Sequence, residues 1–230
     1  MWRRGRIADP QLTQRIRPDG GTLSDLVILA PHMDDETLGC GGLLALASDP
    51  LVVFAVRTNV PDSDIDEVAQ LLGFRYKVLY EKEYDSRLQQ VDRSELIRRF
   101  EDVLHDERPQ QVLIPEPSYH QDHVTVYECG IAATRPLSRR GYTAPFVATY
   151  EYPGSAWSRS GRESELNYFV DTTGVHKLKL DAITVYERSQ QGRDMVTREV
   201  VDAWARLRGE AVGLPFAEGF RVLRQVAPCG

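Results

Sequence analysis

The sequence predicts an α/β fold, a single Rossmann-like domain with a mostly parallel sheet flanked by helices. Three observations carry this prediction. Short apolar runs alternate with helical patterns along the first half of the chain, which is typical of βαβ units. Clusters of histidine and aspartate directly follow two of these runs, and open α/β sheets bind ligands at the carboxyl ends of their strands. A chain of 230 residues with 42% hydrophobic residues can also bury one sizeable core.

The predicted strands of the first half are short and mostly apolar. They cover residues 26–30, 51–56, 76–79 and 111–114. The first three are followed by segments with helical periodicity, at residues 37–47, 64–72 and 92–105. Because uninterrupted apolar runs are typical of strands covered on both faces by helices, we expect these strands to be parallel.

The second half of the chain predicts fewer regular elements. Helices are expected at residues 122–133, 175–187 and 194–207, and strands at 146–152 and 220–223. Residues 153–162 are rich in turn formers and contain Trp157, so we expect a loop there. That loop could cover a substrate, or its tryptophan could pack against the core.

Composition and charge exclude several classes of protein. The formal net charge is −6, and no basic stripe with interleaved aromatic residues is present, so nucleic acid is not an expected partner. No run approaches the roughly 20 apolar residues of a membrane span. The arginine-rich segment 2–6 is not followed by the apolar stretch of a signal peptide, and we expect a cytoplasmic protein.

Domain organisation and cysteine usage are simple. We assign residues 1–24 to an N-terminal extension and residues 25–230 to the domain. Three widely spaced cysteines predict neither a disulfide framework nor a zinc finger. Cys40 is expected to be a small packed residue.

His32, Asp34 and Asp35 follow the first predicted strand. Adjacent carboxylates raise one another's pKa, and a cation relieves this repulsion while leaving one carboxylate free as a base. Alternatively, the acidic residues could merely complement a helix dipole, a contribution of about 0.3–1 kcal/mol each. That alternative leaves the second histidine cluster of the chain without an explanation.

His120 and His123 form the second cluster, after the predicted strand at 111–114. Pro115 and Pro117 prevent a helix and lead the chain across the edge of the sheet. At the loop-to-helix junction that follows, one imidazole could bind a metal while the other faces a substrate. Two histidines and one aspartate would leave a fourth position open, as in catalytic zinc sites. Together the clusters predict a hydrolytic metal site.

These residues resemble the PIG-L/LmbE-like family of zinc-dependent N-deacetylases. The family pattern is a His-Pro-Asp-Asp-Glu run followed later by His-x-Asp-His. Both are present here, with Met33 in place of the proline, a substitution that removes no ligand and no base. Weaker similarities occur at residues 170–171, 179–183, 189–190 and 217–220.

Carried over residue by residue, the resemblance implies one zinc ion per chain, bound by His32, Asp35 and His123. Asp34 would be the general base. His120 would face the substrate carbonyl, where in its protonated form it could stabilise the oxyanion and pass a proton to the departing amine. Neighbouring aspartates can divide these roles, because a carboxylate that binds zinc loses basicity.

Four further residues are candidates for substrate contact or for support of the ligands. Arg57 follows the second strand on the metal side and could bind a hydroxyl or phosphate group, or be a solvated loop residue. Tyr119 could donate to an oxyanion or simply pack. Asp122 is expected to accept a hydrogen bond from a metal-bound imidazole. Trp157 is the loop tryptophan already mentioned.

The sequence therefore predicts a zinc-dependent hydrolase that removes an acetyl group from an N-acetylated amino sugar, or from its glycoside or lipid-linked form. Its expected partner is a small-molecule amino sugar. The alternative enzyme is an amidase of the same mechanism acting on a thiol conjugate. A non-catalytic sugar-binding protein is a third possibility, against which the intact ligands and Asp34 argue.

Overall fold

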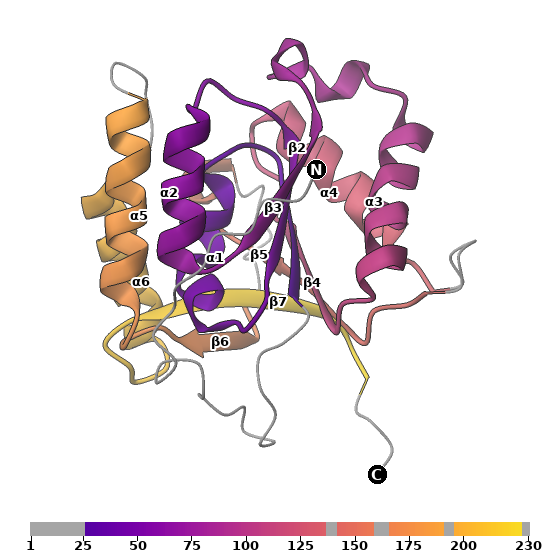
Figure 1. The fold of residues 1–230 in the computed structure, drawn as a ribbon. Helices are drawn as coiled ribbons and strands as arrows, with labels where there is room; N and C mark the ends of the chain where they lie inside the picture. Colours follow the sequence, from indigo (N-terminus) through magenta and orange to yellow (C-terminus); the bar gives the residue numbers. More distant parts are fainter. Residues whose placement is uncertain (1–25, 137–141, 159–165, 191–195, 227–230) are drawn as a thin grey trace.

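The computed structural model describes residues 26–136, 142–158, 166–190 and 196–226, apart from the side chains of residues 156–158. A seven-stranded sheet lies between two layers of helices (Figure 1). This confirms the predicted α/β fold. The extension assigned to residues 1–24 lies outside the described residues, and the domain boundary stays a prediction.

Five neighbouring strands of the sheet are parallel. The strands are β1 (Leu26–Ala30), β2 (Leu51–Val56), β3 (Arg75–Tyr80), β4 (Gln111–Pro115), β5 (Phe146–Tyr150), β6 (Tyr168–Asp171) and β7 (Ala217–Gln225). Their order across the sheet is β3-β2-β1-β4-β5-β7-β6. Strands β1 to β5 pair in parallel, whereas β7 runs antiparallel to β5 and β6. The sheet is therefore mostly parallel, as predicted.

Helices cover both faces of the sheet. They are α1 (Asp35–Leu46), α2 (Asp62–Leu72), α3 (Arg93–Glu107), α4 (Gln121–Ala133), α5 (His176–Ser189) and α6 (Arg198–Glu210). The first two and last two lie on one side, and α3 and α4 on the other (Figure 1). Each layer encloses its own hydrophobic core. Because helices cover both faces, every residue of β1, β2 and β4 is buried.

The structure differs from the sequence expectations mainly after β5. The sequence pattern does not predict β6, a short strand that is only partly buried and so lacks an apolar run. Strand β7 is longer than the expected 220–223 because it pairs on both sides. The loop expected at 153–162 begins with a short 3₁₀ helix, η3 (Pro153–Ser158), which contains Trp157. Residues 159–162 lie outside the described residues.

A buried ion pair connects α1 to α5 and β7. Lys179 Nζ donates to Glu218 Oε1 at 2.7 Å and to the carbonyl of Leu38 at 2.9 Å. The same Glu218 carboxylate accepts from the backbone N–H groups of Gly42 and Leu43, at 2.7 and 2.9 Å. These four bonds fix α1, the helix that follows the first motif, against the C-terminal part of the chain.

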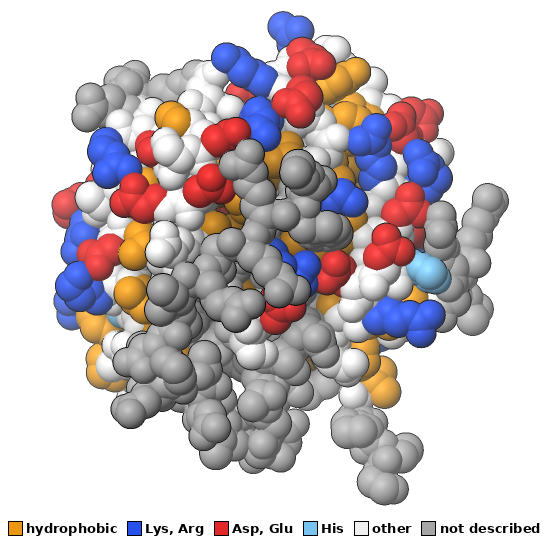
Figure 2. All heavy atoms as spheres, viewed as in Figure 1, with side chains coloured by type: hydrophobic (Ala, Val, Ile, Leu, Met, Phe, Trp, Pro, Cys, Tyr) orange, Lys and Arg blue, Asp and Glu red, His pale blue; other side chains and the backbone are white. Residues whose placement is uncertain are grey.

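The visible surface carries both kinds of charge. Figure 2 shows one face of the molecule, on which Lys and Arg side chains are interspersed with Asp and Glu. This mixture agrees with the modest net charge of −6. Within the described ranges, no helix combines the length and apolar character needed to cross a membrane.

We predict that Lys179→Ala lowers the free energy of unfolding by about 3–5 kcal/mol, because it leaves the Glu218 carboxylate buried without its counter-charge. Lys177 on the same helix pairs with Asp181 but has a side chain that is 83% exposed. Lys177→Ala is therefore the matched control and should cost less than about 0.5 kcal/mol. Urea unfolding measures both values. Equal midpoints for the two variants would contradict a stabilising role of the buried pair.

Candidate active site

The two motifs meet at the carboxyl edge of β1 and β4, which are neighbours in the sheet. The chain leaves β1 into α1 on one face and leaves β4 towards α4 on the other (Figure 1). Open α/β sheets bind ligands in the crevice formed at such a reversal. A pocket of about 460 Å³ lies here, and its lining includes all five predicted ligand and catalytic residues. The volume is typical of small-molecule sites.

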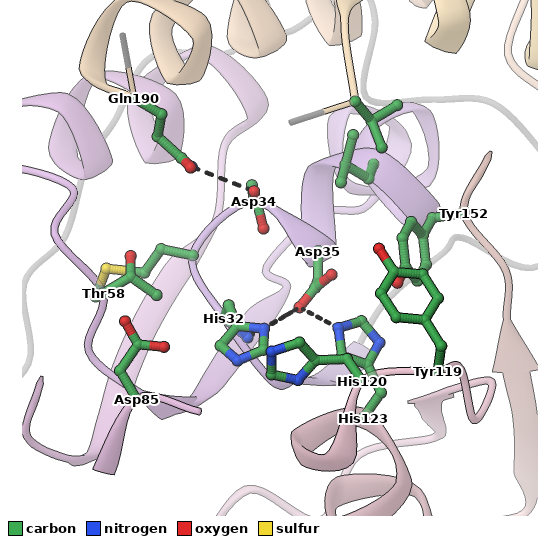
Figure 3. Close-up of a pocket in the computed structure, with 13 residues that line it drawn as sticks. His32, Asp34, Asp35, Thr58, Asp85, Tyr119, His120, His123, Tyr152 and Gln190 are labelled. Atoms are coloured by element: carbon green, nitrogen blue, oxygen red, sulfur yellow. Dashed lines mark hydrogen bonds and ion pairs between the residues drawn. The ribbon is translucent and has the colours of Figure 1, made fainter. Parts of the chain in front are cut away.

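The first motif forms the turn between β1 and α1. Asp35, the first residue of α1, is buried, and its Oδ2 accepts from the backbone N–H of His32 at 2.9 Å. Asp34 has φ 150°, a conformation that L residues rarely adopt; backbone strain of this kind is concentrated at functional sites. Gln190 Nε2 donates to Asp34 Oδ2 at 3.2 Å (Figure 3). The two aspartates thus share a pocket but have different partners.

Glu36 supports this turn from the interior. It accepts hydrogen bonds from the hydroxyls of Thr37 and Tyr186, both at 2.6 Å, and from the backbone N–H of Asp34 at 3.1 Å. Burial raises the pKa of Glu36 to about 7, although the hydrogen bonds from Thr37 and Tyr186 oppose the shift. Tyr186 and Gln190 are one helical turn apart, so the end of α5 holds both Glu36 and Asp34.

The second motif forms the N-terminus of α4. His120 is the N-cap, and its Nδ1 accepts from the backbone N–H of Asp122 at 3.2 Å. The fully buried Asp122 accepts from the backbone N–H of Leu88, and its other oxygen lies 3.0 Å from His32 Nε2. Asp122 is therefore placed to accept a hydrogen bond from an imidazole of the first motif, the role that the sequence predicts for it.

His32, Asp35 and His123 converge on one point (Figure 3). Asp35 Oδ2 lies 3.3 Å from His32 Nδ1 and 3.4 Å from His123 Nε2. Ligand atoms of a tetrahedral zinc site, with bonds of about 2.0–2.1 Å, are about 3.3–3.4 Å apart, so this group fits the metal.

A second group, His32 with His120 and Asp122, also converges. In this second group, His120 Nδ1 accepts the N-cap hydrogen bond, and Asp122 Oδ2 lies within hydrogen-bond distance of His32 Nε2, so the group fits less well.

The charges of the first group also suit a cation. Burial lowers the pKa of His123 to about 4, which leaves the neutral imidazole that a ligand requires. Burial opposes ionisation of Asp35, yet the adjacent His123 imidazole and the hydrogen bond to His32 lower its pKa. Burial likewise disfavours the charged form of His32, but hydrogen bonds to Asp122 and Asp35 raise its pKa to about 10. A bound cation would displace that proton and take over its role beside the carboxylates.

The pKa of His120 is shifted in the opposite direction to that of His32. Burial and the nearby charge of His32 lower its pKa, and the ring centroids of the two are 4.7 Å apart. Because its Nδ1 accepts the cap hydrogen bond, the neutral ring carries its proton on Nε2. The sequence analysis expects a protonated ring that can also pass a proton to the departing amine, and that part of the role of His120 stays a prediction. A neutral imidazole can donate to an oxyanion, but it has no additional proton for a departing amine.

Of the candidates for substrate contact, Tyr119 lies in the pocket lining and Arg57 does not. Tyr119 lines the pocket and is 61% exposed. The guanidinium of Arg57 pairs with Asp62 at 2.5 Å and with Glu81 at 3.2 Å, and Arg57 is not part of the described pocket lining. The neighbouring residue Thr58 lines the pocket in its place.

Sequence reasoning missed two supporting residues. Tyr152 follows β5, and its ring centroid lies 5.1 Å from that of His123. Its hydroxyl lies 3.3 Å from Ser118 Oγ, which accepts from the backbone N–H of His120. Because β5 neighbours β4, its position just beyond a strand end could have indicated Tyr152. Only the weak family similarity at residues 189–190 marks Gln190.

Comparison with known proteins identifies a family match that spans both motifs. Residues 27–134, which contain both motifs, match the family described as PIG-L: GlcNAc-PI de-N-acetylase. The chain is 27% identical over 149 residues to the uncharacterized deacetylase YaiS of Escherichia coli (strain K12), covering 57% of this chain and 75% of YaiS. The match over residues 27–134 confirms the resemblance to the PIG-L family that the two motifs predict.

Solved structures share the fold. N,N'-diacetylchitobiose deacetylase from Pyrococcus horikoshii matches with a TM-score of 0.65 and 23% identity, over 87% of this chain and 84% of that one. GalB, the 4-carboxy-2-hydroxymuconate hydratase from Pseudomonas putida KT2440, matches with a TM-score of 0.66 and 21% identity, over 90% and 98%. A deacetylase and a hydratase share this architecture, so the site has to decide the reaction.

We predict that Asp122→Asn weakens zinc binding about 10–100-fold, the usual effect of losing a carboxylate that orients a ligand imidazole. Asp106 in α3 is exposed and lies beside His105, so Asp106→Asn is a control that also alters a carboxylate next to a histidine. Competition against a zinc-sensitive dye gives both affinities. Unchanged affinity in Asp122→Asn would show that His32 is oriented without this carboxylate.

Proposed function

We propose that this protein is a zinc-dependent hydrolase that removes the acetyl group from an N-acetylated amino sugar, or from its glycoside or lipid-linked form. One observation carries the proposal. Asp34 shares a pocket with three ligand atoms spaced for zinc, but does not belong to that group. A free carboxylate beside a metal site is the arrangement that amide hydrolysis requires. The match to YaiS and the fold of the chitobiose deacetylase support the substrate class.

His32, Asp35 and His123 would hold one zinc ion. When bound there, the ion would supply Lewis acidity towards the substrate carbonyl and the attacking water. Asp34 takes a proton from that water. Burial and the charge of Asp35 raise the pKa of Asp34, which strengthens it as a base, and Gln190 holds its carboxylate in place.

His120 stabilises the charge that develops as water attacks the acetamide carbon. Its Nε2–H donates to the oxygen that becomes negative. When the C–N bond breaks, the proton held by Asp34 passes to the departing nitrogen, and the second proton of the water leaves with the acetic acid. The protons balance without an imidazolium, in agreement with the neutral state of His120.

An amidase acting on a thiol conjugate would use the same residues and would differ only in the group attached to the amide. A sugar-binding protein without catalysis would need neither Asp34 nor its hydrogen bond from Gln190. The complete set of residues therefore favours a hydrolase over a binding protein, and the match to YaiS supports the deacetylase over the amidase.

Zinc-loaded protein should release acetate from N-acetylglucosamine glycosides. We expect Asp34→Asn to keep zinc but to lower kcat by about 10²–10⁴, the usual contribution of a positioned general base. Asp35→Asn, the same chemical change at the adjacent residue, is the matched control and should lose zinc instead. Acetate release and metal analysis on the same preparations separate the two roles. Equal zinc loss in both variants would refute this division, and turnover of thiol conjugates alone would favour the amidase.

The role of His120 is tested by His120→Asn, because asparagine is a favourable N-cap and should preserve the start of α4. We expect kcat to fall about 10²–10³-fold with little change in KM, since the lost donor contacts the oxyanion only in the transition state. Zinc content and melting temperature should match those of the parent. A higher KM at unchanged kcat would mark His120 as an ordinary binding contact.

A further inference from the structure

The pocket has two chemically different walls. Figure 3 shows Thr58 and Asp85 on one side of the histidines and Tyr119 and Tyr152 on the other. Both tyrosines line the pocket on that side. A polar wall therefore faces an apolar one across the proposed catalytic centre.

The apolar wall is the outer edge of a small hydrophobic cluster. The members of the cluster are Leu38, Tyr152, Leu180, Ile183 and Val201, with Val196 packed against them. Three of these residues, Leu38, Tyr152 and Val196, also line the pocket. Because Leu38 and Tyr152 are only 5% and 6% exposed, this wall is held in shape by core packing. It can receive an apolar group without rearrangement.

Tyr119 completes this wall at the pocket mouth. It is 61% exposed, the largest exposed fraction among the described large hydrophobic side chains. The backbone beside it is held by the hydrogen bond from the N–H of His120 to Ser118 Oγ. On the opposite wall, Thr58 Oγ1 is buried and has no hydrogen-bond partner among the described residues. One wall thus offers a hydroxyl to a polar ligand edge, and the other offers an aromatic face to an apolar one.

We propose that Tyr119, with Leu38, Tyr152 and Val196, forms a subsite for a flat apolar group attached to the acetamido sugar, such as an aryl aglycone. The proposal rests on the proposed function and narrows its substrate class to N-acetyl amino-sugar glycosides with an apolar aglycone. The aglycone stacks on the Tyr119 ring, and the hydroxyl edge of the sugar faces the polar wall. A glycoside without an apolar aglycone leaves Tyr119 exposed to water and therefore binds more weakly.

The test compares phenyl and methyl N-acetyl-β-glucosaminides as substrates of the zinc-loaded protein. We expect Tyr119→Ala to raise KM for the phenyl glycoside about three- to tenfold more than for the methyl glycoside, at similar kcat, as expected for one aromatic contact. Tyr119→Phe keeps the ring and should keep the preference. Leu207→Ala removes a side chain that is 56% exposed on α6 and does not line the pocket, so it should change neither KM.

Two results would overturn the subsite. An equal effect of Tyr119→Ala on both glycosides would show that the ring does not contact the aglycone. Loss of the preference in Tyr119→Phe as well would show that the hydroxyl is used instead of the ring, the role in oxyanion binding that the sequence also allows.

Binding to Asp34→Asn, followed by saturation-transfer NMR, separates this proposal from the proposed function. Tighter binding of the phenyl glycoside, with no acetate released from either glycoside by the parent, would leave the subsite standing and refute the deacetylase. Acetate release without any preference for the phenyl glycoside would support the deacetylase and refute the subsite. If the protein neither bound the glycosides nor released acetate from them, both the subsite and the deacetylase would be refuted.

Discussion

Three consecutive carboxylates at the carboxyl end of β1 impose the constraint on which the rest of the site depends. Burial disfavours each charge, and the neighbouring charges repel one another. Asp35 is compensated by two imidazoles. Asp34 accepts from Gln190, and Glu36 accepts from Tyr186, so both depend on α5. Each carboxylate therefore has a different environment, and under the proposed function this difference would allow Asp35 to bind a metal while Asp34 remains a base.

Helix α5 links this constraint to the rest of the fold. Its Lys179 fixes α1 through Glu218, and its last turn reaches the acidic residues through Tyr186 and Gln190. These residues lie beyond the matched family region at 27–134. The motifs of that region supply the reactive groups, and the C-terminal part of the chain sets their positions. A chain with both motifs but a different α5 would keep the proposed ligands and lose the support of the base.

Much of this arrangement could be predicted from sequence, for identifiable reasons. Strands β1, β2 and β4 are buried on both faces, so their uninterrupted apolar runs mark them. Strand β6 is half-exposed and leaves no such signal.

The site residues were predictable to different degrees. Residues that closely follow a strand end, such as His32, are indicated by their position, whereas Gln190 reaches the site only through the packing of α5. The neutral state of His120 follows from its N-cap hydrogen bond, which requires coordinates. Arg57 follows a strand as well, but ion pairs with Asp62 and Glu81 engage its side chain.

We infer that a metal is held by Asp35 with two imidazoles, and not by the neighbouring group that includes Asp122. This inference can be tested by anomalous diffraction at the zinc edge from zinc-loaded crystals. We expect one peak at about 2.0–2.2 Å from Asp35, His32 and His123. A peak between His120 and Asp122, or crystals of active protein with no peak at the first group, would contradict it.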